Sequence, residues 1–126
     1  MRDFRNLLAW QKADDLVVGV YKVTAGFPTD ERYGLTSQIR RAAVSIAANI
    51  AEGSGRQSLK DFVHFLYLAR GSLAEVEYYI HLAQRLDYLT SAQALTLGQL
   101  RKEAGGTLQG LINAISRQME SGRTDN

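Results

Sequence analysis

The feature that most constrains this chain is a run of ten mostly small, apolar residues from Ala42 to Ala51, which follows a basic pair and leads into Glu52 and a glycine-rich turn. On a helix at about 100° per residue, the apolar side chains of this region form one stripe that faces a core. The stripe consists of Leu35, Ile39, Ala42, Ala43, Ile46 and Ile50. The opposite side is also apolar, at Val44, Ala47, Ala48 and Ala51. Because a solvated helix would carry charge there, the pattern predicts burial on both sides.

A second copy of the chain is the partner that we expect on that opposite side. A chain of 126 residues has little material with which to surround one of its own helices. Alanine also favours a helix and lets another backbone approach closely. The sequence therefore predicts a homo-oligomer with Val44, Ala47, Ala48 and Ala51 at its interface. The alternative is a central helix in an ordinary monomer.

A polar stripe interrupts the apolar surface of the same helix, at Arg41, Ser45, Asn49 and Glu52. Intervals of four, four and three residues place these side chains on one line. Buried polar groups need partners, and a later helix offers Arg70, Glu75 and Glu77. We expect a buried network that fixes helix register, with Glu52 contacting Arg70. The alternative is a ligand-binding or catalytic stripe, which the absence of histidine on it disfavours.

Hydrophobic spacing and capping signals predict four helices in one domain. Apolar residues recur at alternating intervals of four and three from Phe62 to Ala83, which is typical of bundle packing. Ser58 and Thr90 each begin a capping motif, and Gly53 is expected to end the second helix. The predicted helices span about residues 8–25, 30–52, 59–86 and 91–119 of a single 1–126 domain. Short links between them predict an all-α, antiparallel up-down-up-down four-helix bundle.

Composition removes several classes of protein from consideration. The chain has no cysteine, so a disulfide framework, a thiolate nucleophile and a cysteine metal site are all excluded. No apolar run approaches the roughly 18 residues of a membrane helix, and the first residues are too polar for a signal peptide. We expect a cytoplasmic protein that makes no membrane contact.

The sequence also lacks the residue pattern of a di-iron centre, which is the metal site that four-helix bundles commonly hold. A di-iron centre needs two Glu-x-x-His pairs and two further glutamates. Here Glu77 and His81 are four residues apart, and no second pair exists. His64 and His81 would lie about 25 Å apart along one helix, which is too far to share a metal. We therefore predict no catalytic residues, no metal, no cofactor and no small-molecule substrate, and hence a non-enzymatic protein.

Five segments together resemble one bacterial family, the four-helix-bundle or 23S rRNA-intervening sequence proteins. They are residues 8–13 (LAWQKA), 27–28 (FP), 33–42 (YGLTSQIRRA), 45–53 (SIAANIAEG) and 69–77 (ARGSLAEVE). The resemblance implies an antiparallel four-helix bundle that assembles into a ring, a pentamer. It also implies a partner that is RNA or a nucleoprotein, because relatives include an accessory protein of diversity-generating retroelements that acts with a reverse transcriptase and nucleic acid.

The charge of the chain is compatible with an RNA or nucleoprotein partner but does not require one. The net charge is +2 and the isoelectric point is about 9.0. The candidates for nucleic-acid contact are Arg2, Arg5, Arg40, Arg56, Lys60, Arg101 and Lys102. Gly53 to Arg56 lead into the next helix, where backbone amides can hold phosphate, although a glycine cap followed by a serine cap explains the same residues. No recognition motif is present, so we expect binding led by phosphate contacts.

Two other interpretations stay open at this point. The basic residues are also compatible with ordinary solvated helix faces. Surplus apolar surface, including Tyr67, Tyr78 and Tyr79, would suit a protein-interaction adaptor that makes no direct nucleic-acid contact.

Overall fold

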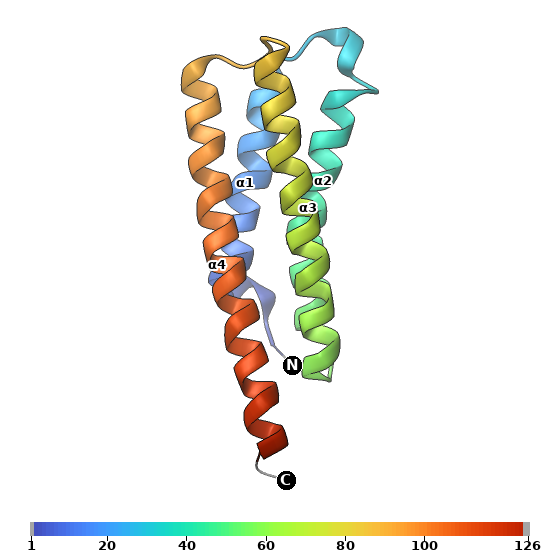
Figure 1. Cartoon of the computed structure of the whole chain (residues 1–126). Coiled ribbons are helices and arrows are strands. Elements are labelled where there is room, and N and C mark those ends of the chain that lie inside the picture. Colours follow the sequence, from blue (N-terminus) through green and yellow to red (C-terminus); the bar gives the residue numbers. More distant parts are fainter. Residues whose placement is uncertain (1, 125–126) are drawn as a thin grey trace.

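The computed structural model describes residues 2–124 and confirms the all-α four-helix bundle. Its elements are η1 (Phe4–Asn6), α1 (Leu8–Thr24), η2 (Thr29–Glu31), α2 (Leu35–Ser54), α3 (Leu59–Arg85) and α4 (Ser91–Thr124). Successive long helices run in opposite directions, as Figure 1 shows. Within residues 2–124 there is no strand, and no helix is both long and apolar enough to cross a membrane.

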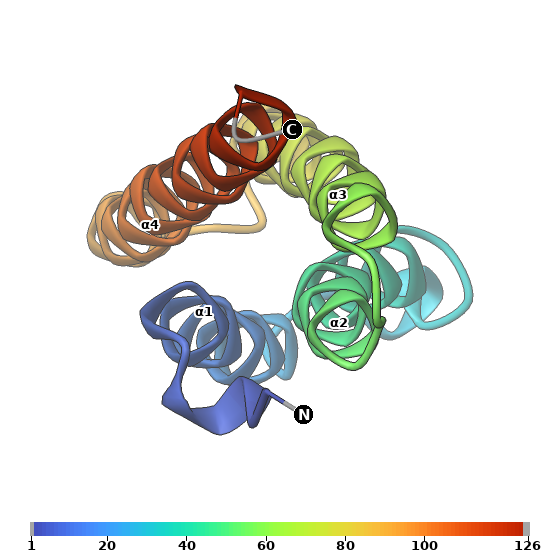
Figure 2. The ribbon, with the colours of Figure 1, turned by 90° about the horizontal axis from the view of Figure 1, so that it is seen from below.

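The four helices enclose one main core, with a smaller cluster around Phe27, Leu35 and Ala83, and each helix packs against two neighbours. α2 contacts α1 and α3, and α4 contacts the same two helices, so α2 and α4 occupy opposite corners (Figure 2). Each helix contributes a side chain that is almost completely buried, namely Leu16, Ile46, Leu66 and Leu108. The predicted apolar stripe of α2 and the predicted seam of α3 are buried throughout. Helical periodicity therefore identified the core face of both helices.

The second helix begins later than predicted. Its expected span of 30–52 is divided into the short η2 and the long α2, with a break at residues 32–34. Glu31 holds this break in place: its Oε1 accepts a hydrogen bond from the Leu35 backbone N–H (3.1 Å), and its Oε2 accepts one from the Tyr88 hydroxyl (2.9 Å). A Cβ on Gly34 would lie 2.5 Å from Glu31 Oε1, so glycine makes this arrangement possible. The Glu31 carboxylate also raises the pKa of Tyr88, because it accepts a hydrogen bond from the neutral phenol.

The end of α2 also differs from the prediction. Gly53 was expected to cap the helix, but α2 continues through Ser54 and Gly55 is the capping residue. A Cβ on Gly53 would lie 2.8 Å from Phe65 Cβ and 3.2 Å from the Phe62 carbonyl oxygen. Gly53 therefore allows α3 to pack closely against α2, and it does not form a turn. The predicted caps of the next helices are confirmed by hydrogen bonds from Asp61 N to Ser58 Oγ and from Gln93 N to Thr90 Oγ1.

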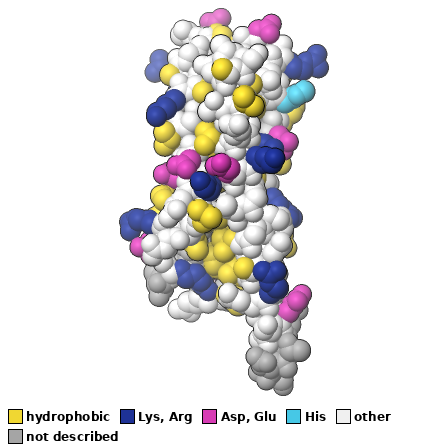
Figure 3. Space-filling model, turned by 90° about the vertical axis from the view of Figure 1, so that its left-hand side faces the viewer, with side chains coloured by type: hydrophobic (Ala, Val, Ile, Leu, Met, Phe, Trp, Pro, Cys, Tyr) yellow, Lys and Arg dark blue, Asp and Glu magenta, His cyan; other side chains and the backbone are white. Residues whose placement is uncertain are grey.

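One face of the bundle carries an apolar hollow between α1 and α4. It has a volume of about 310 Å³, and its lining residues are Leu7, Leu8, Ala9, Thr107, Gly110 and Leu111. Figure 3 shows hydrophobic side chains gathered in the lower half of this face. Leu8 is 57% exposed there. We call this feature the α1–α4 hollow.

Candidate nucleic-acid interface

The basic residues predicted for nucleic-acid contact do not gather at one place. Arg2, Arg56 and Lys60 lie near the turn between α2 and α3, Arg40 lies on the first half of α2, and Arg101 and Lys102 lie on α4. Several of them form ion pairs with carboxylates of the same chain. Arg5 pairs with Asp3 at 3.7 Å, and Arg101 pairs with Glu77 at 3.5 Å. Lys60 and Lys102 are exposed.

At the α2–α3 turn, the arginines take part in holding the fold together. Arg2 Nη1 donates hydrogen bonds to the carbonyl oxygens of Arg56 (2.9 Å) and Ser54 (3.4 Å), and its guanidinium lies 4.7 Å from the centre of the Phe62 ring. Arg56 Nη2 donates to Glu52 Oε1 at 2.6 Å and stacks over Phe65. These bonds tie the start of the chain to the end of α2, so both guanidinium groups already have partners.

A second basic region lies along the first half of α2, and the structure assembles it from residues that are mostly outside the predicted set. It is an open groove of about 690 Å³, which we call the arginine–tyrosine groove. Its lining residues are Tyr21, Arg32, Tyr33, Thr36, Ser37, Arg40, Arg41, Val44 and Ser45. Three arginines line it and no carboxylate does. Its surface is therefore positive and suited to an anionic ligand.

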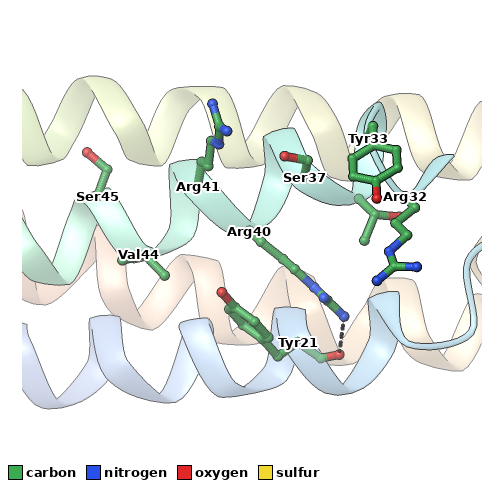
Figure 4. Close-up of a pocket in the computed structure, with 9 residues that line it drawn as sticks. Tyr21, Arg32, Tyr33, Ser37, Arg40, Arg41, Val44 and Ser45 are labelled. Carbon is green, nitrogen blue, oxygen red and sulfur yellow. Dashed lines mark hydrogen bonds between the residues drawn. The ribbon is translucent and has the colours of Figure 1, made fainter.

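Arg40 forms a fixed wall of this groove. Its Nε donates a hydrogen bond to Thr24 Oγ1 at 2.8 Å, and its Nη2 donates to the Tyr21 carbonyl oxygen at 3.5 Å. The guanidinium also lies 4.5 Å from the centre of the Tyr21 ring. Figure 4 shows this side chain extended from α2 toward α1. Because these partners are neutral, the positive charge of Arg40 stays uncompensated by any of them.

Arg32 and Arg41 also line the groove, and both side chains are exposed. Arg41 is exposed, although the sequence assigned it to a buried network. Arg32 is also exposed, with its guanidinium 5.6 Å from the centre of the Tyr33 ring. In Figure 4, Arg32 points toward α1 while Arg41 points to the opposite side of α2. Their guanidinium groups thus flank the groove on two sides.

Sequence reasoning missed Arg32, Tyr33 and Tyr21 as site residues. The available signal was the pair Arg32–Tyr33 placed directly before a helix that carries Arg40–Arg41 two turns later. The spacing alone did not reveal the groove, because Tyr21 comes from α1 and the break at residues 32–34 sets the position of Tyr33.

The predicted polar network forms only in part. Asn49 Nδ2 donates to the Ser45 carbonyl oxygen (2.8 Å) and to Ser45 Oγ (3.0 Å), and Ser72 Oγ donates to Ser45 Oγ (2.9 Å). This cluster links α2 to α3, but through Ser72, which was not a member of the predicted network.

The predicted contact between Glu52 and Arg70 is wrong. Glu52 pairs with Arg56, and Arg70 Nη1 donates to Gln109 Oε1 on α4 at 3.2 Å. The reason is rotational: on α3, Arg70 faces α4, whereas Ser72 faces α2. Arg41, Glu75 and Glu77 are exposed, so these members of the predicted network are surface residues.

The predicted oligomer interface also needs a correction. Val44 is 41% exposed, Ala48 is exposed and Ala51 is half-buried. Ala47, however, is only 9% exposed and belongs to the core of its own chain. Three of the four candidates therefore present apolar surface outward from α2.

Among residues 2–124, no group of three or more histidine or acidic side chains is arranged to hold a metal ion. His64 and His81 are both exposed on α3. The residues that the structure brings together are thus cations, tyrosines and hydroxyls, a set that binds anions by charge and hydrogen bonding.

Comparison with known proteins places the chain in a family. The model of the 23S rRNA-intervening sequence protein family matches residues 5–110. A solved protein of unknown function from the S23 ribosomal protein family of Bacteroides thetaiotaomicron shares 26% identity, with a TM-score of 0.76 over 83% of this chain and 95% of that one. No curated protein matches the chain. The chain belongs to the 23S rRNA-intervening sequence protein family.

Proposed function

We propose that this protein is a non-enzymatic, homo-oligomeric scaffold of the cytoplasm that binds RNA through the arginine–tyrosine groove. The observation that carries the proposal is the presence of Arg32, Arg40 and Arg41 in one groove that no carboxylate lines. Guanidinium groups bind phosphate with paired, charge-assisted hydrogen bonds. The family description, which refers to 23S rRNA, makes RNA the first ligand to test.

The two kinds of arginine in the groove have different roles in this proposal. Arg40 is held by Thr24 and Tyr21, so it offers a fixed positive charge at little entropic cost. Arg32 and Arg41 are exposed and are able to turn toward phosphates that pass on either side of α2. Contacts to phosphate carry no sequence information, so binding depends strongly on salt and weakly on sequence.

In a homo-oligomer, each copy of the chain contributes one such positive groove. We propose that Ala48 and Ala51 on the outward face of α2 pack into the α1–α4 hollow of a neighbouring copy, while Val44, which lines the arginine–tyrosine groove, lies at the edge of that contact. Both surfaces are apolar and at least partly exposed, and they lie on different sides of the bundle, because the hollow lies between α1 and α4 and α4 does not contact α2. A contact between two different patches is heterologous, and it produces a ring when the rotation closes. Five copies is the ring size that the family resemblance implies.

The test of RNA binding is a salt series with purified, nuclease-treated protein and a labelled structured RNA. The proposal predicts an affinity that falls steeply as salt rises, because phosphate binding releases counterions. Absence of binding even at low salt would contradict the proposal. That result would direct attention to the protein-adaptor interpretation, and a pull-down that resists nuclease would then test it.

The test of assembly is the mass in solution by light scattering. Ala48→Glu places a charge in the proposed contact and should reduce the protein to a monomer. Ala74→Glu, at an exposed alanine on α3, serves as the matched control and should keep the mass of the wild-type protein. If Ala48→Glu also keeps the wild-type mass, the outward face of α2 is not the interface.

A further inference from the structure

We infer that the arginine–tyrosine groove holds an unpaired nucleotide, with its base stacked on the Tyr33 ring and its flanking phosphates held by Arg32 and Arg41. This inference rests on the proposed function and adds to it the class of nucleic acid: single-stranded segments in preference to duplex. Four observations support it, namely the exposure of Tyr33, the hydrogen bonds that hold its backbone, the cations in the same groove and the volume of the groove.

Among residues 2–122, Tyr33 has the most exposed large hydrophobic side chain, at 88%. An aromatic ring left in water contributes little to folding, because its apolar surface is not removed from solvent. Tyr88, in the same corner of the molecule, illustrates the contrast. It is half-buried, packs 5.5 Å from the Phe27 ring and donates a hydrogen bond to Glu31. Tyr88 therefore has a structural role, whereas the Tyr33 ring is available to a ligand.

The backbone that carries Tyr33 is anchored on both sides. Glu31 accepts hydrogen bonds from Leu35 N and from the Tyr88 hydroxyl, and the Gly34 N–H donates to the Glu31 carbonyl oxygen at 2.9 Å. Phe27 and Leu35, on the two sides of the break, are both buried. The ring therefore stands on a fixed support, and a ligand that stacks on it does not have to order the loop first.

Two exposed cations line the same groove as the Tyr33 ring, one beside the ring and one further along α2. The Arg32 guanidinium lies 5.6 Å from the Tyr33 ring centre, and Arg41 approaches the groove from further along α2. Figure 4 shows Tyr33 and Arg32 together at one end of the groove and Arg41 further along α2. Alternation of an aromatic face with arginines is the arrangement by which proteins bind single strands.

The size of the groove favours one nucleotide over a duplex. The groove is open to solvent, and its volume of about 690 Å³ is comparable to that of sites for one small ligand. In a duplex the faces of the bases are covered by their neighbours, so Tyr33 would have no face to stack on. A duplex would then contact the arginines alone.

The experiment measures binding of the full-length protein to fluorescent oligouridine, to oligodeoxythymidine of the same length, and to the same oligouridine annealed to oligoadenosine. We expect tighter binding of the single strands. Tyr33→Ala should weaken single-strand binding on the order of tenfold and leave duplex binding unchanged, because it removes the ring on which a base stacks. Tyr33→Phe should bind within about twofold of wild type, since stacking needs the ring and not the hydroxyl.

Two further variants separate stacking from charge. Tyr78→Ala removes another exposed tyrosine, on α3 and outside the groove, and should have no effect. Arg32→Gln with Arg41→Gln should reduce the slope of log affinity against log salt by roughly 0.7 for each phosphate that the protein no longer neutralises. Tyr33→Ala should leave that slope unchanged. Equal binding of oligouridine and oligodeoxythymidine supports recognition of base and phosphate alone, and a preference for oligouridine supports an added contact to the 2′-hydroxyl.

The inference is overturned if Tyr33→Ala leaves single-strand binding unchanged, or if it weakens duplex binding equally. In either case salt-dependent binding of the wild-type protein would still support the proposed function. If the wild-type protein binds neither form at low salt, both proposals fail together.

Discussion

The two ends of α2 both place arginines beside aromatic rings, yet they use them differently. At the C-terminal end, Arg2 and Arg56 stack on Phe62 and Phe65 and bond to carbonyl oxygens and to Glu52. At the N-terminal end, the rings beside the arginines are exposed tyrosines, and Arg32 and Arg41 reach the surface of an open groove. The comparison teaches that arginines beside aromatic rings can either tie segments of the fold together or line an open groove in which their charge is available to a ligand.

The largest expected effect is on stability at the C-terminal end of α2, where this helix packs closely against α3. Gly53→Ala should lower the free energy of unfolding by about 1–2 kcal/mol, because overpacking against α3 exceeds the gain in helix propensity. The new methyl group would meet Phe65 Cβ and the Phe62 backbone, neither of which is the flexible end of a side chain. Urea denaturation measures the change.

Gly55→Ala is the matched control for that experiment. An added Cβ on Gly55 finds only ordinary contacts at 3.6 Å and beyond, and its φ of −83° suits alanine. We expect a change within about 0.5 kcal/mol. Equal stability of both variants would mean that α2 and α3 do not approach each other so closely at Gly53.

The arginines at the two ends of α2 should also differ in how much they contribute to stability, and this effect is smaller. Arg2→Gln should lower the free energy of unfolding by about 1 kcal/mol, because it removes two hydrogen bonds to carbonyl oxygens at a partly exposed site. Arg41→Gln should change it by less than about 0.5 kcal/mol, because Arg41 is exposed. Thermal and urea unfolding of the two variants provide the comparison. A greater destabilisation by Arg41→Gln would contradict the distinction.

The smallest effect concerns the hydrogen bond between Tyr88 and Glu31, which helps to hold the loop that carries Tyr33. The Glu31 carboxylate raises the pKa of Tyr88 above its ordinary 10.0, because it accepts a hydrogen bond from the neutral phenol. The folded state therefore favours the neutral phenol, and this stabilisation is complete below pH 10 and is lost as the pH rises through the raised pKa.

Glu31→Gln should return the Tyr88 pKa toward its ordinary value, as followed by the ultraviolet absorbance of phenolate with Tyr88→Phe as the reference. Asp30→Asn, which removes a weaker charge effect, should lower the pKa less. An unchanged Tyr88 pKa in Glu31→Gln would mean that this hydrogen bond does not anchor the loop.

Much of the fold was predictable because periodicity reports burial directly. Ile39, Ile46 and Ile50 recur at helical spacing and are buried at 0–1% exposure. The ends of α2 were harder to predict, because each depends on a contact with a distant residue. Glu31 reaches Tyr88, which is 57 positions away, and Gly53 accommodates the side chain and backbone of α3.

The candidate site was less predictable than the fold, for a related reason. Charge and spacing identified Arg40, but they did not show that Arg2 and Arg56 would bond to backbone and carboxylate oxygens of the same chain. They also placed Arg41 inside a network, because the apolar residues around it suggested burial on both sides of α2. The partners of an arginine follow from tertiary packing, which local sequence does not encode.

The most direct test of the central claim compares two double variants in RNA binding across a salt series, well below their unfolding temperatures. Arg32→Gln with Arg41→Gln changes the open groove, and Arg2→Gln with Arg56→Gln changes the engaged turn. We predict that the first lowers both affinity and the salt slope, while the second unfolds earlier but binds like the wild-type protein. A fall in affinity confined to the second pair would contradict this claim.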